Sequence, residues 1–260
     1  WDTPEHYQPL WLKYYLYFLE KGLQKNGEII TITHFSKMRL HQLPPFKSIP
    51  IQVVYQASGL SKNFAHSDLQ STTQSPYFLH VGVLEKRKNL SLLIQAFDKL
   101  TKMEGYESLR LVLVGQRGPR ETLDDYDHLV DLVTSLGLTD QVDFTGYVSQ
   151  EQLASYFQHA LGYVFPSTNE GFGLPVLEAF SFGLPVIISR QGALMEVAGD
   201  AALILKKNEE EALIQSMKLL VDDPDLRKEL GEKGSIRLQE FSAEKFYLSL
   251  EQAFKEILKR

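Results

Sequence analysis

Apolar and polar positions alternate in a regular strand-and-helix rhythm from Tyr77 to about residue 205. Short runs rich in β-branched and aromatic residues are separated by longer stretches with apolar residues at helical spacing. The runs predict strands over 77–83, 109–114, 142–145, 161–165, 186–189 and 202–205, and the longer stretches predict helices over 90–102, 121–136, 149–159 and 174–182. This alternation is typical of a parallel sheet flanked by helices, which places the chain in the α/β class.

Capping residues mark several of the predicted helix ends. Gly137 is expected to end one helix, and Ser149 with Gln152 forms a capping-box pattern at the start of the next. Beyond residue 205 the pattern is wholly helical, and Asn208 with Glu211 is predicted to form a second capping box. Two further N-caps are predicted at Asp223, which precedes Pro224, and at Ser242. Three helices are therefore expected to close the chain.

A polar segment separates this region from the start of the chain. Residues 61–76 contain almost no large aliphatic side chain, which is the composition of an exposed linker. Upstream, an aromatic-rich helical stretch over 9–25 precedes a strand-like run over 28–33 and a short helix from Ser36. This order is expected at the end of a domain. Because residue 1 is Trp1 rather than methionine, the natural start is expected further upstream.

The helical stretch near the N-terminus carries an aromatic stripe formed by Trp11, Tyr14, Tyr15 and Phe18. Such a stripe occurs on membrane-surface helices as well as in protein cores. The few basic residues around it do not make the charged face that a membrane-surface helix needs. Packing in a core is therefore predicted.

Composition and charge exclude several classes of site and partner. The 27 basic and 33 acidic residues give a net charge of −6 and form no basic block of the kind that binds nucleic acid. The absence of cysteine excludes disulfides, thiolate zinc sites and cysteine nucleophiles. The seven histidines show no metal-ligand spacing, so no metal site is predicted, and His80 is interpreted as a buried strand histidine bonded to the backbone. Neither a dinucleotide fingerprint nor a P-loop occurs.

Hydropathy gives no sign of a membrane span. No apolar run approaches the length of about 18 residues that crosses a bilayer, and the N-terminus lacks the order of a signal peptide. The expected location is cytoplasmic, with peripheral association at a membrane as the alternative.

The segment over 167–189 contains the most informative pattern. Gly171 and Gly173 follow a predicted strand, so backbone N–H groups in this loop can approach a ligand closely. Pro175 suits the first turn of the helix that follows, and the start of a helix attracts anions. A phosphate group would fit at this junction.

Two glutamates flank the same junction. Glu170 precedes the glycines, and Glu178 follows inside the helix. A carboxylate repels a phosphate but accepts hydrogen bonds from hydroxyls, so the pair favours a sugar or ribose beside the phosphate. A plain strand-turn-helix with solvated glutamates is the alternative. A duplicated binding loop is rejected, because the second Phe-Gly-Leu-Pro copy, at 182–185, ends a helix.

These residues resemble a known family. The run from Glu170 to Glu178, EGFGLPVLE, resembles the paired-glutamate motif of GT-B glycosyltransferases, specifically the retaining family 4 enzymes, or glycosyl transferases group 1. The run HVGVLEKRKN over 80–89 resembles the family's first strand and basic loop, and VDFTGYV over 142–148 resembles its base-facing loop. The resemblance extends over about 77–260.

The resemblance implies a role for each matching residue. Glu170 would hold hydroxyls of the transferred sugar, and Lys88 would neutralise the departing diphosphate, which makes these two the expected catalytic residues. Glu178 would bind the ribose, and Arg87 would assist at the diphosphate in place of an arginine that many members carry where this chain has Val83. The other expected donor contacts are Gly82, Val148, Gly171, Phe172, Gly173 and Leu174.

The resemblance also implies a domain organisation of GT-B type. Residues 77–241 would form the Rossmann-like domain that binds the nucleotide sugar, and 242–260 a closing helix that packs back toward the N-terminal domain. Residues 1–60 would be the end of that partial second Rossmann-like domain, which carries the acceptor site, and 61–76 the linker. Most of the acceptor half is expected to be missing, so the 260-residue chain is expected to bind its donor but to transfer sugar poorly alone.

The implied activity is transfer of a hexose from a GDP- or UDP-linked sugar to a glycan or lipid-linked acceptor, with retention of configuration. The loop over 85–89 looks like that of bacterial mannosyltransferases that act on polysaccharide, so mannose is the expected sugar. No cofactor is expected, because the nucleotide sugar is a substrate. The alternatives are a sugar-nucleotide epimerase of GT-B type and a non-catalytic module that binds nucleotide sugars.

Overall fold

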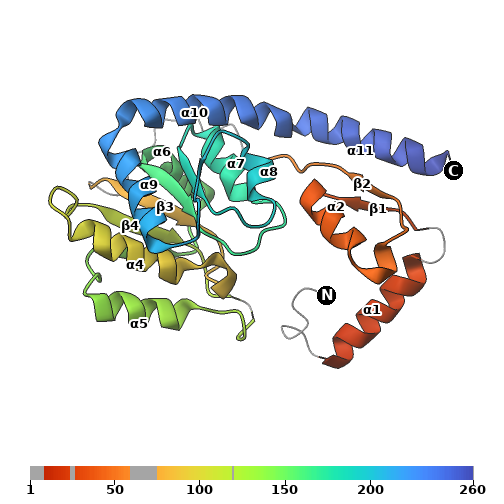
Figure 1. The fold of residues 1–260 in the computed structure, drawn as a ribbon, viewed down its shortest axis with the longest axis horizontal. Coiled ribbons are helices and arrows are strands. Elements are labelled where there is room, and N and C mark those ends of the chain that lie inside the picture. The colour runs from red at the N-terminus through yellow and green to blue at the C-terminus, as the bar shows by residue number, and fades with distance from the viewer. Residues whose placement is uncertain (1–8, 24–26, 59–74, 119, 260) are drawn as a thin grey trace. The chain divides into compact units, whose positions relative to one another are not determined.

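The computed structural model describes residues 9–23, 27–58, 75–118 and 120–259 (Figure 1). The chain divides into two compact units, of which one joins 1–57 with 241–260 and the other comprises 58–240. The predicted linker over 61–76 lies outside the described residues except for its last two positions.

The larger unit is built on a six-stranded sheet with the strand order β5-β4-β3-β6-β7-β8. Every neighbouring pair in this sheet is parallel. The prediction of an α/β fold with a parallel sheet is therefore confirmed. The strands are β3 (Tyr77–Val81), β4 (Arg110–Val114), β5 (Val142–Gly146), β6 (Gly162–Phe165), β7 (Val186–Ile188) and β8 (Leu203–Ile204).

Helices cover this sheet on both faces (Figure 1). Helices α4 (Leu90–Thr101), α5 (Tyr126–Leu136) and α9 (Glu210–Asp222) share one buried core with Phe78, Leu111 and other strand residues. On the opposite face, the ring of Phe157 lies 5.9 Å from that of Tyr163 on β6. That face carries α6 (Gln150–His159) and α7 (Leu174–Ser181), and α10 (Pro224–Leu238) packs against α7. The shorter elements are α8 (Leu194–Ala198) and the 3-10 turns η3 (Lys86–Lys88) and η4 (Gln239–Phe241).

Local capping chemistry fixes most helix ends where it was predicted. Ser149 and Gln152 form the reciprocal capping box of α6, and Gly137 ends α5 with φ 73°. Asp223 and Ser242 accept hydrogen bonds from backbone N–H groups as N-caps. The Asn208 capping box is wrong: α9 begins after Glu209, and the Asn208 side-chain amide instead donates to the carbonyl of Pro166 at 3.0 Å.

The helix predicted over 121–136 begins later, at Tyr126. The preceding residues are held in a loop by backbone hydrogen bonds to the segment after β3. The N–H of Lys86 donates to the carbonyl of Leu123 at 2.9 Å, and the N–H of Asp125 donates to that of Leu84 at 3.1 Å. These tertiary bonds compete with the first helical turn.

The smaller unit contains a β-α-β element. Strands β1 (Ile29–Thr31) and β2 (Ile51–Val53) pair in parallel, and α2 (His34–His41) lies between them in the sequence. The hydroxyl of Thr33 accepts a hydrogen bond from the N–H of Ser36, so α2 starts two residues earlier than predicted. The unit also contains η2 (Pro44–Phe46), α1 (Pro9–Leu23) and α11 (Ala243–Leu258).

The aromatic stripe on α1 is exposed rather than buried. Tyr14, Tyr15 and Phe18 are 59%, 48% and 68% exposed, and the side chain of Trp11 lies outside the described residues. The prediction of core packing is wrong for these three residues, because the described residues leave about half or more of each side chain exposed. Within the described part of the chain, no helix has both the length and the apolar character to span a bilayer.

Candidate functional site

The candidate site lies where the strand order changes direction. Strands β3 and β6 are neighbours, and their parallel pairing brings the loops after both strands to the same edge of the sheet. The chain leaves β3 toward β4 on one side and leaves β6 toward β7 on the other. In open α/β sheets, ligands bind at such a switch point beyond the carboxyl ends of the strands.

Hydrogen bonds tie the two loops to each other. The carbonyl of Arg87 accepts from the N–H and the hydroxyl of Thr168, at 2.8 and 3.2 Å. Asn89 adopts a left-handed conformation with φ 56°, and its side-chain amide donates to the carbonyl of Pro166 at 3.4 Å. The loop after β3 is therefore held against the loop after β6.

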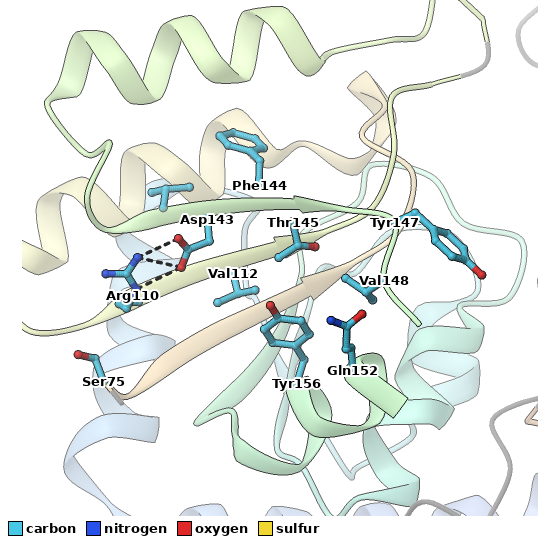
Figure 2. A pocket seen from close by; sticks show the side chains of 11 residues that line it. Ser75, Arg110, Val112, Asp143, Phe144, Thr145, Tyr147, Val148, Gln152 and Tyr156 are labelled. Atoms are coloured by element: carbon cyan, nitrogen blue, oxygen red, sulfur yellow. Dashed lines mark hydrogen bonds and ion pairs between the residues drawn. The ribbon is translucent and has the colours of Figure 1, made fainter. Parts of the chain in front are cut away.

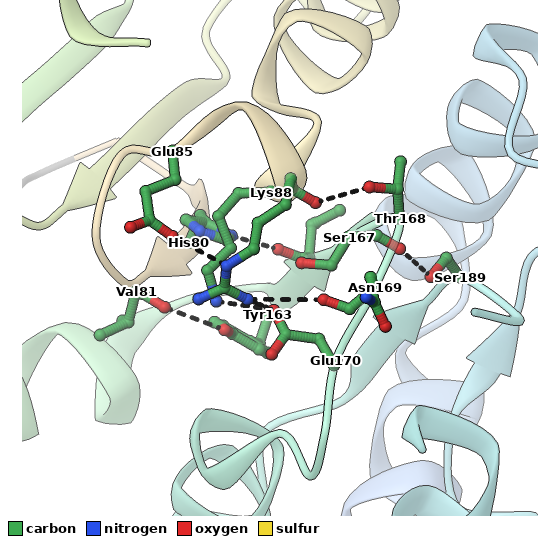
Figure 3. A network of polar contacts seen from close by, with 12 residues as sticks. His80, Val81, Glu85, Lys88, Tyr163, Ser167, Thr168, Asn169, Glu170 and Ser189 are labelled. Atoms are coloured by element: carbon green, nitrogen blue, oxygen red, sulfur yellow. Dashed lines mark hydrogen bonds and ion pairs between the residues drawn. The ribbon is translucent and has the colours of Figure 1, made fainter. Parts of the chain in front are cut away.

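Four charged side chains meet at this junction (Figure 3). Lys88 Nζ and Arg87 Nη1 each lie 2.7 Å from the same oxygen, Oε1 of Glu170. On its other side, Arg87 Nε donates to Glu85 Oε2 at 2.8 Å. Glu85, Arg87, Lys88 and Glu170 form this charge cluster, in which two cations balance two carboxylates.

Lys88 is the most enclosed cation of the charge cluster. Its side chain is 7% exposed, against 40% for that of Arg87. Its ammonium also lies 4.6 Å from the centre of the Phe165 ring, a cation–π contact. Burial lowers the pKa of Lys88, and the nearby carboxylate of Glu170 acts in the opposite direction. A buried ammonium beside a helix start interacts strongly with an entering anion, because little water screens it.

His80 is a buried residue next to Lys88. It is fully buried, and its Nδ1 lies 2.9 Å from the carbonyl of Val164, so Nδ1 donates and Nε2 is left as an acceptor. Nε2 has no hydrogen-bond partner among the described residues. Burial first, and then the charge of Lys88, lowers the pKa of His80 to about 3. The prediction of a buried strand histidine bonded to the backbone is confirmed, and the ring is neutral at physiological pH.

Glycines allow the loops of the site to approach one another closely. A Cβ on Gly82 would lie 3.5 Å from Lys88 Cε and 3.6 Å from His80 Nε2, so Gly82 lines the same corner. A Cβ on Gly115, after β4, would lie 1.8 Å from the carbonyl oxygen of Gly82. The loops after β3 and β4 are therefore in direct backbone contact.

The predicted glycine loop leads from the charge cluster into α7. Gly173 is the N-cap of α7 with φ 101°, and Leu174 is its first residue. Phe172 is buried, whereas Gly171 is exposed and has open space around it. A positive helix start thus follows Glu170 after the three residues of the glycine loop.

Glu178 lies within α7, outside the charge cluster. Burial alone raises the pKa of its carboxyl group. Tyr163 lies near both predicted glutamates: burial raises the pKa of its hydroxyl well above the usual range, and the charges of Glu178 and Glu170 add to this effect. The hydroxyl of Tyr163 donates to the carbonyl of Val81 at 3.2 Å, which fixes the position of the ring.

Glu178→Gln is expected to raise thermal stability at neutral pH. Because its pKa is raised, the carboxyl group of Glu178 binds a proton more tightly in the folded state than in the unfolded chain. The stability that this protonation contributes is fully present below the pKa of Glu178 in the unfolded chain, and it is lost as the pH rises through the pKa in the folded state. The gain in melting temperature should therefore be present at pH 7 and absent below about pH 4. Glu232→Gln, an exposed residue of α10, serves as the control. An equal gain at both pH values would show that titration of Glu178 is not the cause.

A second feature lies away from the charge cluster. A groove of about 720 Å³ lies over β4 and β5 beside α6 (Figure 2). The predicted contact Val148 lines one end of the groove, and a bidentate ion pair between Arg110 and Asp143 lies at the other, with Nη2–Oδ1 at 2.8 Å. Residues of both strands line this groove, including Val112 on β4 and Thr145 on β5. Val148 is therefore not brought to the charge cluster.

Two residues of the site were missed from the sequence. Glu85 belongs to the charge cluster, and its position in the loop matched to the family was the available signal. Gly192 supports the backbone of Glu170, since a Cβ there would lie 2.3 Å from the Glu170 carbonyl oxygen. A glycine shortly after a predicted strand was the signal for this second residue. Among the described residues, no group of three or more histidine or acidic side chains could hold a metal ion.

A family model and the related proteins found by sequence comparison agree with one another. The family model described as glycosyl transferases group 1 matches residues 61–237. The chain is 30% identical over 249 residues to O-antigen chain mannosyltransferase B of Escherichia coli, covering 93% of this chain and 64% of that protein. It is 28% identical over 213 residues to O-antigen chain mannosyltransferase RfbU of Salmonella typhimurium, covering 82% of this chain and 56% of that protein.

A solved structure shows the same architecture. Sucrose-phosphate synthase from Thermosynechococcus elongatus superposes with a TM-score of 0.76 at 26% identity, over 88% of this chain and 58% of that chain. The fold is thus of GT-B type, as predicted. The chain spans less than two thirds of the length of these proteins.

Proposed function

This chain belongs to the family of glycosyl transferases group 1, and on that premise we propose that it transfers a hexose from a nucleoside-diphosphate sugar to a glycan or lipid-linked acceptor with retention of configuration. The observation that carries the proposal is the meeting of Lys88 and Arg87 on one oxygen of Glu170, directly before the start of α7. Two cations and a helix start suit a diphosphate, and the carboxylate suits sugar hydroxyls.

The chemistry follows from where charge develops. Transfer breaks the bond between the anomeric carbon and a phosphate oxygen, and negative charge accumulates on the diphosphate. Lys88, Arg87 and the start of α7 would stabilise that charge without having to reorganise. The diphosphate would take over the two cations that contact Glu170, which leaves Glu170 to accept hydrogen bonds from the sugar. Glu178 would accept hydrogen bonds from the ribose.

We propose mannose, carried by GDP, as the donor sugar. The support comes from the E. coli and S. typhimurium relatives, which are named as O-antigen chain mannosyltransferases. Retention and membership of family 4 are supported by the resemblance of the segment from Glu170 to Glu178 to the paired-glutamate motif.

Calorimetric titration with UDP, GDP, their hexose conjugates and NAD tests the proposal. One family of nucleoside diphosphates is expected to bind, and GDP-mannose more tightly than UDP-sugars. Glu178→Ala is expected to weaken that binding by about 1 to 3 kcal/mol, because the ribose would lose a charge-assisted hydrogen bond. Glu232→Ala, on the exposed face of α10, should leave it unchanged. Binding of NAD instead, or of no nucleoside diphosphate, would contradict the proposed function.

A further inference from the structure

Glu85 is a buried acid whose position is fixed by its surroundings. It is 8% exposed, and its backbone N–H donates to the carbonyl of Val83 at 2.9 Å while its carbonyl accepts from the N–H of Lys88 at 2.8 Å. A Cβ on Gly118 would lie 3.2 Å from Glu85 Cγ, so the loop after β4 presses against the side chain. The carboxylate therefore has a defined location at the edge of the site.

In contrast to the buried Glu85, Arg87 has a partly exposed side chain. Its side chain is 40% exposed and has many rotamers available, yet it is held by three acceptors. Nε donates to Glu85 Oε2 at 2.8 Å, and Nη1 donates to Glu170 Oε1 at 2.7 Å and to the carbonyl of Asn169 at 3.5 Å. The contact with Glu85 uses Nε, and Nη1 points toward Glu170.

When a diphosphate displaces Glu170 from the cations, the ion pair with Glu85 continues to hold Arg87 in place, beside a longer hydrogen bond from Nη1 to the carbonyl of Asn169 at 3.5 Å. Lys88 does not need such support, because its side chain is 7% exposed and enclosed by the loop. Arg87, the more exposed of the two cations, therefore depends on Glu85, whose position is fixed.

We propose that Glu85 is a positioning residue for donor binding, which acts through Arg87 and holds the guanidinium against the diphosphate. This inference rests on the proposed function, since it assumes that the junction binds a nucleoside diphosphate. Glu85 itself does not contact the ligand. An unpaired carboxylate at the edge of the site would repel a phosphate. The ion pair with Arg87 neutralises the charge of Glu85, so an acid at this position can support the binding of a diphosphate.

The test measures the affinity of the 260-residue chain for UDP and GDP, and for UMP and GMP, by calorimetry. Glu85→Ala is expected to weaken diphosphate binding by about 3- to 30-fold and to leave monophosphate binding within about twofold, because the proposal places Arg87, beside Glu170, at the distal phosphate. Glu85→Gln keeps an acceptor oxygen for Arg87 Nε and is expected to retain affinity within about threefold. Asp98→Ala, which removes a similarly buried acid paired with Lys102 on α4, should change neither affinity.

A double-mutant cycle separates positioning from general support of the fold. In an Arg87→Ala background, Glu85→Ala is expected not to weaken diphosphate affinity further, and to raise it slightly because an unpaired carboxylate is removed. Equal weakening of mono- and diphosphate binding, or a full effect of Glu85→Ala without Arg87, would overturn the inference. An unchanged diphosphate affinity in Glu85→Ala would also overturn it. If the unaltered chain binds no nucleoside diphosphate, the proposed function itself fails, so the two failures are distinguishable.

Discussion

Lys88→Met in the 260-residue chain is expected to weaken binding of the preferred nucleoside diphosphate by about 10- to 100-fold. The substitution keeps the apolar stem of the side chain and removes the buried ammonium that lies 2.7 Å from Glu170 Oε1. Arg87 still neutralises Glu170, so the variant is expected to fold. The loss arises because an enclosed charge interacts with a phosphate more strongly than an exposed charge does.

Titration calorimetry with UDP and GDP measures this effect. Lys99→Met is the control, because it removes a lysine that pairs with Glu210 between α4 and α9 and does not belong to the charge cluster. The control should bind as the unaltered chain does. An affinity of Lys88→Met within about threefold of the original would show that this ammonium does not contact the diphosphate.

Gly192→Ala is expected to lower the free energy of unfolding of the larger unit by about 2 to 4 kcal/mol. Gly192 has φ +67°, and an added Cβ would lie 2.3 Å from the carbonyl oxygen and 2.5 Å from the nitrogen of Glu170. Both neighbours are backbone atoms, so no flexible side chain can move aside. The loop that carries Glu170 must shift, which also separates its carboxylate from Lys88.

Urea denaturation of the two glycine variants Gly192→Ala and Gly171→Ala tests this prediction. Gly171 belongs to the same loop, but a Cβ there would meet nothing within 4 Å, so its replacement should change the unfolding midpoint little. Equal midpoints for both variants would refute the packing argument. A lower midpoint for Gly171→Ala alone would reverse it.

Local patterns predicted the individual strands and helix caps well because apolar runs and capping hydrogen bonds involve neighbours in the sequence. Apolar runs located the six strands, and Ser149, Gly137 and Asp223 marked helix ends through hydrogen bonds that span only a few residues. Asn208 failed because its amide found a partner 42 positions away, on Pro166. The aromatic stripe of α1 failed for a related reason, since burial depends on what covers a face and not on the face itself.

The charge cluster was predictable only in part. Lys88 and Glu170 were assigned separate roles from the family resemblance, but their direct contact joins residues 82 positions apart and depends on the adjacency of β3 and β6. Strand order is not encoded in the apolar pattern of any single strand. The role of Glu85 also depends on a three-dimensional feature, the close approach of Gly118.

The strand order has a consequence for how this unit folds. Strands β3, β4 and β5 follow one another and can assemble locally, as can β6, β7 and β8, but the pairing of β3 with β6 joins the two halves across a long sequence separation. Contacts of this kind carry a large loop-closure cost and are slow to form. The charge cluster lies where β3 and β6 pair, so neither half alone contains both Lys88 and Glu170. A nucleotide bound there would stabilise both halves together and raise the unfolding temperature of residues 58–240 as one cooperative transition.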